Sequence, residues 1–356
     1  MEKYDIIVIG GGPAGAVFSY FIDPKYRVLL LEKRDYGADP QRIKSCGGLL
    51  NETAQGLLSS LGYGLPTSIL VDPQIFHVRV LDRDSGQSRR FFKGYLNIDR
   101  EKLDDYLLSR SENEKSNLTV TRGSTYHDFQ RINNRTYRIR YRTGGILKYA
   151  ETKVLVGADG ANSQVAREIV PNIKNICVSI QKRYKKAAPM KEFFAILDSR
   201  INDYYSWVIP KEDEVLLGSV FPQGKNIREK FDLLEASVRE KEGVLGDLIR
   251  EEGTFLKRPR WETQFIGHGS FGLVGEAAGF ISPSSSEGIS YALKSGWLLA
   301  KNLNKYGLDT GIAKYASACK SITTDIRMKF LKSKLLYTPW IRSVLLRTGI
   351  HADPEL

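Results

Sequence analysis

The chain has 356 residues, of which 42% are hydrophobic, so it is long enough for two domains with sizeable cores. No stretch of about eighteen or more uncharged apolar residues is present, which excludes a spanning helix, and residues 6–9 are too short for the apolar part of a signal peptide. The net charge of +12 (53 basic minus 41 acidic residues) favours an anionic ligand or an anionic membrane surface, and no recognised nucleic-acid-binding module accompanies it.

The cysteines and histidines point to no metal or disulfide chemistry. Cys46, Cys177 and Cys319 lie far apart without C-x-x-C spacing, and the four histidines lack metal-ligand spacing. We therefore expect reduced thiols, no metal site and a cytoplasmic location, with peripheral contact at the inner membrane face as an alternative.

Residues 5–32 carry the pattern of a nucleotide-binding βαβ unit. Residues 6–9 form an apolar, β-branched run that fits a buried parallel strand, and Gly10, Gly12 and Gly15 then supply a G-x-G-x-x-G turn into a helix. Gly10 allows the tight turn, Gly12 lets backbone N–H groups approach a pyrophosphate, and Gly15 lets the helix pack close to the strand.

The second strand of this unit, residues 28–31, ends in Glu32. A carboxylate at this distance from the glycines can accept hydrogen bonds from the ribose hydroxyls of adenosine, and it disfavours a 2′-phosphate. The fingerprint alone does not choose between FAD and NAD.

The next segments alternate between loop, helix and strand. A loop through Cys46-Gly47-Gly48 precedes a predicted helix over 52–61. Residues 75–81 alternate as a strand does, with 89–93 as the expected partner. Asp99 is the candidate N-cap of a helix over 101–109. Strands are expected at 118–120, 137–141 and 153–156.

The remaining chain returns from β structure to α/β. The strand at 153–156 leads into Gly157-Ala158-Asp159-Gly160, and residues 177–261 are predicted as strands with one helix over 228–239. A strand at 273–274, a Gly275-Glu276 turn and a helix over 288–303 follow. We expect an α/β fold in which a nucleotide-binding domain (1–72, 97–175 and 265–305) is interleaved with a β-rich substrate domain (73–96 and 176–264), before a C-terminal helical segment (306–356).

The C-terminal segment carries a basic amphipathic stretch. Residues 327–347 contain six bases and no acid, interleaved with large apolar residues. This pattern is typical of a helix resting on a membrane face, and equally of a terminal helix that packs its apolar side onto the protein.

The three glycine-rich segments in this order resemble the FAD-dependent oxidoreductases of the p-hydroxybenzoate hydroxylase superfamily. That superfamily carries an N-terminal G-x-G-x-x-G, a central G-A-D-G-x-x-S, matched at 157–163, and a late G-D-A-A-x-x-x-x-P, matched at 275–283 except that Glu276 replaces the aspartate. Within it, Cys46-Gly47-Gly48 and the 205–210 stretch, Y-S-W-V-I-P, look like the C-G-G and Y-x-W-x-F-P motifs of the geranylgeranyl reductase family. The chain is most similar to the CbrA-type branch of that family.

The resemblance implies a Rossmann-like FAD-binding domain of the glutathione reductase type and a set of FAD-binding residues. Glu276 would bind the pyrophosphate and ribityl region, Arg100 would contact the phosphates, and Pro283 with the amides of Gly288 and Ile289 would border the isoalloxazine. The complete implied set is Gly10, Gly12, Pro13, Ala14, Gly15, Glu32, Lys33, Cys46, Gly47, Arg100, Asp159, Gly160, Gly275, Glu276, Pro283, Gly288 and Ile289. Ser286 departs from the family pattern, which often has glycine there.

Three side chains are candidates for catalysis. Cys46 beside two glycines can tune the flavin or deliver a proton, or it can be an inert buried thiol. Tyr205 and Trp207 lie two residues apart, so on a strand they face the same side and can line an apolar tunnel, with core packing as the alternative.

These residues lead to three function hypotheses. The first is an FAD-dependent reductase of C=C bonds in an isoprenoid or other lipophilic substrate, fed by reduced nicotinamide or another donor. The second is an aromatic monooxygenase or halogenase, and the third is a flavoprotein that binds FAD and lipid without turnover. The sequence leaves the oligomeric state open.

Overall fold

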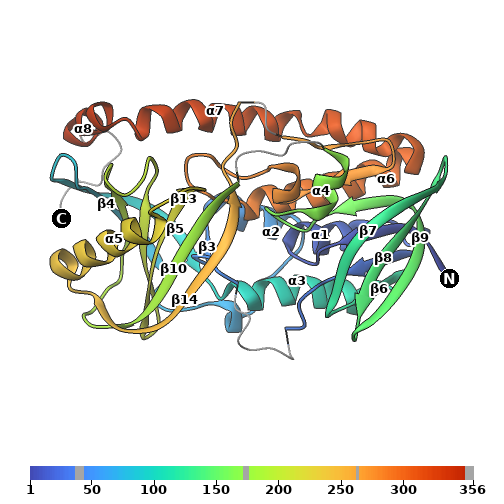
Figure 1. Cartoon of the computed structure of the whole chain (residues 1–356), viewed down its shortest axis with the longest axis horizontal. Helices are drawn as coiled ribbons and strands as arrows, with labels where there is room; N and C mark the ends of the chain where they lie inside the picture. The colour runs from blue at the N-terminus through green and yellow to red at the C-terminus, as the bar shows by residue number, and fades with distance from the viewer. Residues whose placement is uncertain (37–43, 171–175, 262–263, 349–356) are drawn as a thin grey trace. The chain divides into compact units, whose positions relative to one another are not determined.

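A computed structural model of the chain describes residues 1–36, 44–170, 176–261 and 264–348 (Figure 1). The chain divides into two compact units, each built from separate segments. Unit 1 comprises Met1–Arg42, Glu101–Asn175 and Lys257–Met328, and unit 2 comprises Ile43–Arg100, Ile176–Leu256 and Lys329–Leu356. The division is discontinuous, but it differs from the expected boundaries: residues 43–72 lie in unit 2, and the C-terminal segment is shared between the units rather than separate.

Unit 1 is built on a largely parallel sheet. Four parallel pairings join its central strands in the order β16-β9-β1-β2-β6. The strands are β1 (Glu2–Ile9), β2 (Val28–Leu31), β6 (Leu118–Thr121), β7 (Ser124–Asn133), β8 (Thr136–Thr143), β9 (Ile146–Gly157), β15 (Gly267–His268) and β16 (Phe271–Leu273). Ile6, Ile7 and Val8 are fully buried, as expected for a parallel strand covered on both faces.

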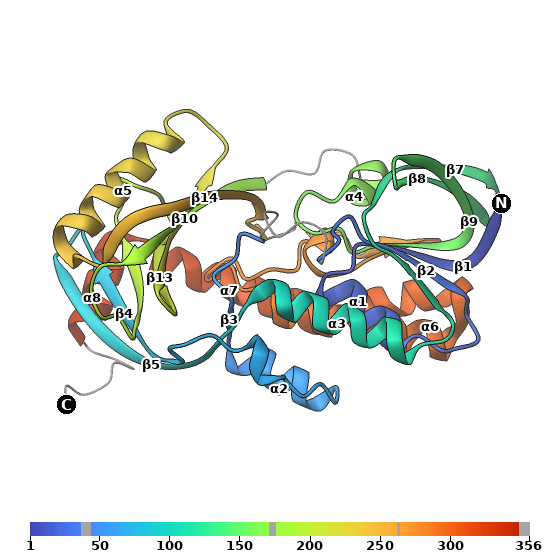
Figure 2. The ribbon, with the colours of Figure 1, turned by 90° about the horizontal axis from the view of Figure 1, so that it is seen from below.

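The helices of unit 1 pack onto this sheet. They are α1 (Pro13–Phe21), α3 (Arg100–Glu114), α4 (Gln164–Ile169) and α6 (Ile289–Ala318), with a short 3-10 helix, η2 (Gly275–Ala278). Helices α1 and α6 run side by side in Figures 1 and 2, and a Cβ on Gly296 of α6 would overlap the carbonyl oxygen of Ala14. The predicted 288–303 helix is confirmed and continues to Ala318 across a break at Gly307, whose φ is +75°.

Unit 2 contains a second eight-stranded sheet in the order β14-β10-β13-β12-β11-β4-β5-β3. Its strands are β3 (Leu49–Leu50), β4 (Ile75–Asp82), β5 (Gln87–Asn97), β10 (Ile176–Lys186), β11 (Phe193–Leu197), β12 (Ser206–Lys211), β13 (Glu214–Pro222) and β14 (Leu245–Lys257). The predicted pairing of 75–81 with 89–93 is confirmed, since β4 and β5 are antiparallel and Val78 lies opposite Phe91.

The core of unit 2 lies between this sheet and helix α5 (Ile227–Glu242), which Figure 2 shows against the strands. Phe231, Leu234 and Val238 recur at helical spacing, and all three are buried in one cluster with residues of β10 to β13. The other helical elements of unit 2 are α2 (Glu52–Ser60) and the 3-10 helix η1 (Thr67–Ile69). Asn51 caps α2 by accepting a hydrogen bond from the N–H of Ala54.

Two helices end the described chain, α7 (Lys320–Leu336) and α8 (Pro339–Thr348). Arg342 of α8 is buried, and its Nη2 lies 2.9 Å from Asp82 Oδ1 and in contact with Asp84 Oδ2. Arg342, one of the six bases of the 327–347 stretch, is therefore buried and anchors α8 to the β4–β5 hairpin. Of the helices that the structure describes, none has the length and apolarity needed to cross a bilayer.

Candidate functional site

The turns that the sequence predicts after the strands of unit 1, each called a corner here, lie at one edge of its parallel sheet. Strands β16, β9, β1 and β2 are neighbours in that order, and each pair is parallel. Their carboxyl ends lead into Gly275-Glu276, Asp159-Gly160, the Gly10 turn and Glu32, respectively. Since ligands of open α/β sheets bind outside the carboxyl ends of the strands, the topology alone brings these segments together.

The glycines of the first corner are required by close approach as well as by conformation. Gly10 has a φ of +104°, and a Cβ there would overlap the carbonyl oxygen of Ala158. A Cβ on Gly15 would overlap the carbonyl oxygen of Gly10, and one on Gly275 would lie 3.0 Å from the Cβ of Ala14. At Gly10 and Gly15 the backbone thus lies in contact with backbone, with no room for a side chain.

The start of α1 has no side-chain cap. Gly12 is its N-cap residue, Pro13 occupies the first helical position, and no acid stands in the first turn. A helix N-terminus of this kind carries partial positive charge and uncapped amides, the features that bind phosphate.

Glu32 is buried at the end of β2 and connects the second strand to the glycine turn. Its Oε2 accepts a hydrogen bond of 2.5 Å from the N–H of Gly11, and its Oε1 accepts one of 2.9 Å from the N–H of Arg34. Each carboxylate oxygen retains a second lone pair for a ribose hydroxyl. Lys33 follows directly and is exposed.

Asp159 organises the second corner. It accepts hydrogen bonds from the Ser163 hydroxyl at 2.5 Å and from the N–H of Gln164 at 2.7 Å, so it caps the start of α4. Burial raises the pKa of Asp159, and these hydrogen bonds act in the opposite direction. Gly160 beside it has a φ of +77° with open space where a Cβ would stand.

The third corner is held by Lys257. The N–H of Lys257 donates to Glu276 Oε1 at 2.7 Å, and its Nζ donates to the carbonyl of Ala277 at 2.9 Å. Burial lowers the pKa of Lys257, and the charge of Glu276 opposes that shift. One lysine therefore fixes both the side chain and the backbone of the Gly275–Ala278 turn.

The predicted isoalloxazine segment forms a tight turn into α6. The N–H of Ser282 donates to the carbonyl of Glu287 at 2.8 Å, and Glu287 in turn accepts from the N–H of Ser290 at 2.7 Å. Pro283 is buried, Gly288 is the N-cap residue of α6, and Ile289 begins the helix.

Ser286 in this turn has a φ of +53°, the conformation that glycine adopts most readily. We expect Ser286→Gly to retain or raise the free energy of unfolding, by up to about 1 kcal/mol, because relief of backbone strain outweighs the entropy of the unfolded chain. Ser286→Val should lower it by about 1–2 kcal/mol, since a β-branched residue resists positive φ. Urea denaturation of both variants measures this difference, and equal free energies of unfolding for Ser286→Gly and Ser286→Val would contradict the strain argument.

The Cys46 loop belongs to unit 2, as does Arg100. Cys46 Sγ accepts a hydrogen bond from the N–H of Gly48 at 3.4 Å and one from Arg100 Nη1 at 3.5 Å. A Cβ on Gly47 would lie 2.8 Å from Ile209 Cδ1 of β12, so the loop lies directly on that strand. The structure therefore brings Arg100 onto the Cys46-Gly47 loop, from which it is separated by more than 50 residues in the sequence.

Lys211, at the end of β12, contacts this loop, and the sequence did not indicate that contact. Its Nζ donates to the carbonyls of Gly48 at 3.1 Å and Ile98 at 2.8 Å, and also to the side-chain oxygen of Asn97. Burial lowers the pKa of Lys211 to about 7. The ammonium ties the Cys46 loop to the segment that leads into Arg100.

Tyr205 and Trp207 lie in an aromatic cluster of unit 2. Their ring centroids are 6.0 Å apart, and the ring of Tyr205 lies 4.9 Å from that of Tyr204. Trp207 is buried over Gly218 and donates its indole N–H to Gln181 at 3.2 Å, so it has a core position. Tyr205 is less buried, and desolvation raises the pKa of its phenol well above the usual value. The catalytic roles assigned to Cys46, Tyr205 and Trp207 stay predictions.

The three thiols differ in exposure, so a thiol reagent can label the Cys46 loop selectively. Cys177 and Cys319 are buried, whereas Cys46 is partly exposed. Burial also raises the pKa of Cys319 to about 12. A thiol reagent should therefore modify Cys46 alone in the native protein, and all three cysteines after denaturation. Mass mapping of the labelled peptides would contradict this expectation if Cys177 or Cys319 reacted first.

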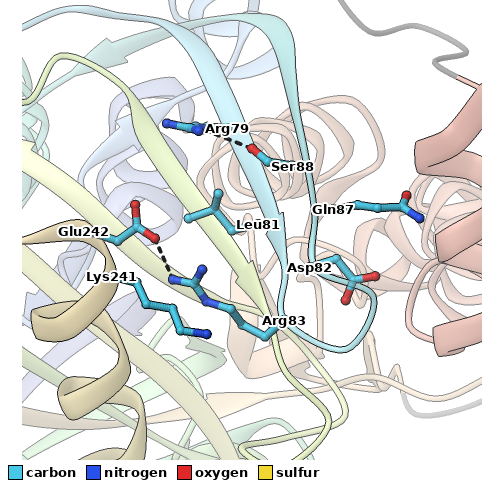
Figure 3. A pocket seen from close by; sticks show the side chains of 9 residues that line it. Arg79, Leu81, Asp82, Arg83, Gln87, Ser88, Lys241 and Glu242 are labelled. Atoms are coloured by element: carbon cyan, nitrogen blue, oxygen red, sulfur yellow. Dashed lines mark hydrogen bonds and ion pairs between the residues drawn. The ribbon is translucent and has the colours of Figure 1, made fainter.

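A cavity of about 310 Å³ lies elsewhere on unit 2 (Figure 3). Two ion pairs involve its charged lining, since Arg83 Nη2 lies 2.6 Å from Glu242 Oε1 and Asp82 binds Arg342. Arg79 likewise donates to Ser88 at 3.0 Å. None of the sequence-predicted site residues lines this cavity.

The chain resembles known proteins along its whole length. It is 32% identical over 362 residues to protein CbrA of Escherichia coli O9:H4 (strain HS), with 100% of this chain and 96% of the relative covered. Protein CbrA of Shigella sonnei (strain Ss046) is also 32% identical, with 100% and 99% covered. No protein-family model matches the sequence.

Solved structures share the fold at lower identity. A geranylgeranyl bacteriochlorophyll reductase-like protein from Thermoplasma acidophilum matches with a TM-score of 0.81 and 19% identity, covering 95% of this chain and 88% of that one. PqsL, a probable FAD-dependent monooxygenase from Pseudomonas aeruginosa, matches with a TM-score of 0.71 and 17% identity over 97% and 100%. A flavin-dependent brominase matches with a TM-score of 0.70 and 19% identity over 97% and 92%. The full-length relationship at 32% identity shows that this chain belongs to the CbrA family.

Proposed function

We propose that this protein is an FAD-dependent oxidoreductase that acts in the cytoplasm. The observation that carries the proposal is the meeting of four corners, after β16, β9, β1 and β2, at one edge of the sheet of unit 1. Close backbone packing at Gly10 and Gly15 and the buried carboxylate of Glu32 fit the ADP half of a dinucleotide.

Each corner of unit 1 has a separate task in this proposal. The uncapped start of α1 at Gly12 would bind phosphate, and Glu32 would accept hydrogen bonds from the ribose. Asp159 and Glu276 would face the rest of the dinucleotide. The start of α6 at Gly288 and Ile289 would stabilise negative charge on the isoalloxazine. When bound, FAD supplies two-electron hydride chemistry that no side chain provides.

For the substrate, we propose an isoprenoid or another lipophilic molecule with C=C bonds to be reduced. The partly exposed ring of Tyr205 in unit 2, which lies among the aromatic rings of Tyr204 and Phe193, supports an apolar ligand. The phenol of Tyr205 is protonated near neutral pH and can donate a hydrogen bond to the substrate, whereas burial raises its pKa and so makes it a weaker acid than an exposed tyrosine. Electrons would come from reduced nicotinamide or another donor.

A monooxygenase or halogenase is the second candidate, because the fold is shared with PqsL and a brominase as well. An anaerobic assay of the FAD-loaded protein with a geranylgeranyl lipid separates the candidates. Substrate-dependent oxidation of reduced flavin without oxygen supports the reductase. An absolute requirement for oxygen supports the second candidate, and no turnover in either condition supports a binding protein. A native protein that neither carries nor takes up FAD, judged by its absorbance spectrum, would overturn the proposal as a whole.

A further inference from the structure

Helix α7 presents an apolar ridge to solvent. Its inner face buries Ile322 and Ile326, whereas Met328 and Leu335 on the opposite face are 62% and 55% exposed, and Leu331 between them is also exposed. At about 100° per residue, the three exposed side chains fall within a sector of about 60° on the helix. A ridge of this kind is unusual on a helix whose other face already packs onto the protein.

Basic side chains flank this ridge on both sides. By the same helical spacing, Lys334 lies about 60° to one side of Leu331, and Lys332 lies about 100° to the other. The sequence has no acidic residue between Asp325 and Asp353. Long lysine side chains can extend from such positions while the apolar residues between them are buried in a partner.

Helix α8 repeats the arrangement. Trp340 is 72% exposed, and Val344, one turn later on the same face, is also exposed. Arg347 is exposed and falls within about 20° of Trp340 on the helix. The buried pairing of Arg342 with Asp82 fixes the opposite face of α8 to unit 2. Trp340 is therefore held outward on an anchored helix rather than on a free tail.

We propose that the outer faces of α7 and α8 form a docking surface for a lipid bilayer that contains anionic lipids. The membrane surface, defined as Leu331, Lys332, Lys334, Leu335, Trp340, Val344 and Arg347, joins apolar side chains, an exposed tryptophan and unopposed positive charge. These are the features of helices that lie in a membrane interface. A second copy of the chain fits less well, because its identical face would set bases against bases.

Binding at this surface is peripheral, since none of the described helices could cross the bilayer. It draws on hydrophobic burial and on attraction to lipid phosphate together, so we expect it to weaken with added salt. The inference does not depend on the chemistry proposed above.

Sedimentation of the full chain with vesicles tests the proposal. We expect binding to vesicles of phosphatidylcholine mixed with phosphatidylglycerol, and little binding to phosphatidylcholine alone. The double variant Leu335→Ser/Trp340→Ala should abolish sedimentation, and Lys332→Gln/Lys334→Gln should weaken it by roughly 10- to 30-fold. Leu248→Ser is the matched control, because Leu248 is 52% exposed on β14 in the same unit but outside the membrane surface.

Three results would overturn the proposal. The first is failure of the unmodified protein to bind the anionic vesicles. The second is binding that Leu248→Ser reduces as much as Leu335→Ser/Trp340→Ala does. The third is a dimer, detected by light scattering in the absence of lipid, that Trp340→Ala converts to a monomer, because it would assign the face to a second copy of the chain. All variants change exposed side chains, and circular dichroism of each variant should match that of the unmodified protein.

Discussion

Gly10→Ala is expected to lower the free energy of unfolding by about 3–5 kcal/mol and to abolish FAD binding. Two costs add at this position. A residue other than glycine at a φ of +104° is strained by about 1–2 kcal/mol, and the new Cβ would overlap the carbonyl oxygen of Ala158, which forces the backbone of two corners apart. Urea denaturation measures the free energy of unfolding, and flavin fluorescence titration measures FAD binding.

Gly123→Ala is the matched control for this prediction. Gly123 also has a positive φ, of +64°, and lies in the same unit, but a Cβ added there would have no neighbouring atom within 4 Å. Its substitution should cost only the strain, about 1 kcal/mol, and leave FAD binding intact. If both variants lost the same stability, close approach at the first corner would not be the reason for Gly10.

Lys211→Met should destabilise the native state by about 2–4 kcal/mol near neutral pH. The substitution removes the ammonium that donates to the carbonyl of Ile98 and to the side-chain oxygen of Asn97, and it removes one of the two donors of the Gly48 carbonyl, which keeps the N–H of Ile98. Lys185→Met on the exposed part of β10 is the control and should have a small effect. The Cys46 loop should also loosen, so that labelling of Cys46 becomes faster in the variant.

The destabilisation should grow with pH, and its sign follows from the pKa. In the unfolded chain a lysine titrates near 10.4, whereas burial lowers the pKa of Lys211 to about 7. Above pH 7 the unfolded state therefore binds more protons than the native state, and native stability rises with pH. The stability difference between the unmodified protein and Lys211→Met should increase by about 2 kcal/mol from pH 7 to about 9. A difference that stays constant would mean that Lys211 remains charged throughout.

Much of the first corner of unit 1 follows from local sequence. The strand at 6–9, the glycine turn and Glu32 lie within one short segment, and their order dictates how the backbone must fold. The second and third corners were predictable for the same reason, because each is a small-residue turn after a buried strand. Parallel pairing of β16, β9 and β1 then places them at one edge.

The contacts made over long sequence distances were not predictable. Lys211 looks like an ordinary strand-end lysine until β12 is placed against the Cys46 loop, more than 160 residues earlier in the chain. Arg342 looks like a solvated base for the same reason, since its partner Asp82 is 260 residues away. The division into two units differs from the expected domain boundaries at 43–72 and in the C-terminal segment, because local composition does not show which sheet a helix or loop packs against.

The backbone contacts around α1 limit which sequences can maintain this fold. Gly15 faces the oxygen of Gly10, and Gly296 of α6 faces the oxygen of Ala14, so neither position has room for one additional carbon atom. Gly62 and Gly86, by contrast, face open space. In a library that samples every amino acid at each position, selection for folded protein should return only glycine at 15 and 296, while 62 and 86 accept asparagine and other residues that tolerate positive φ.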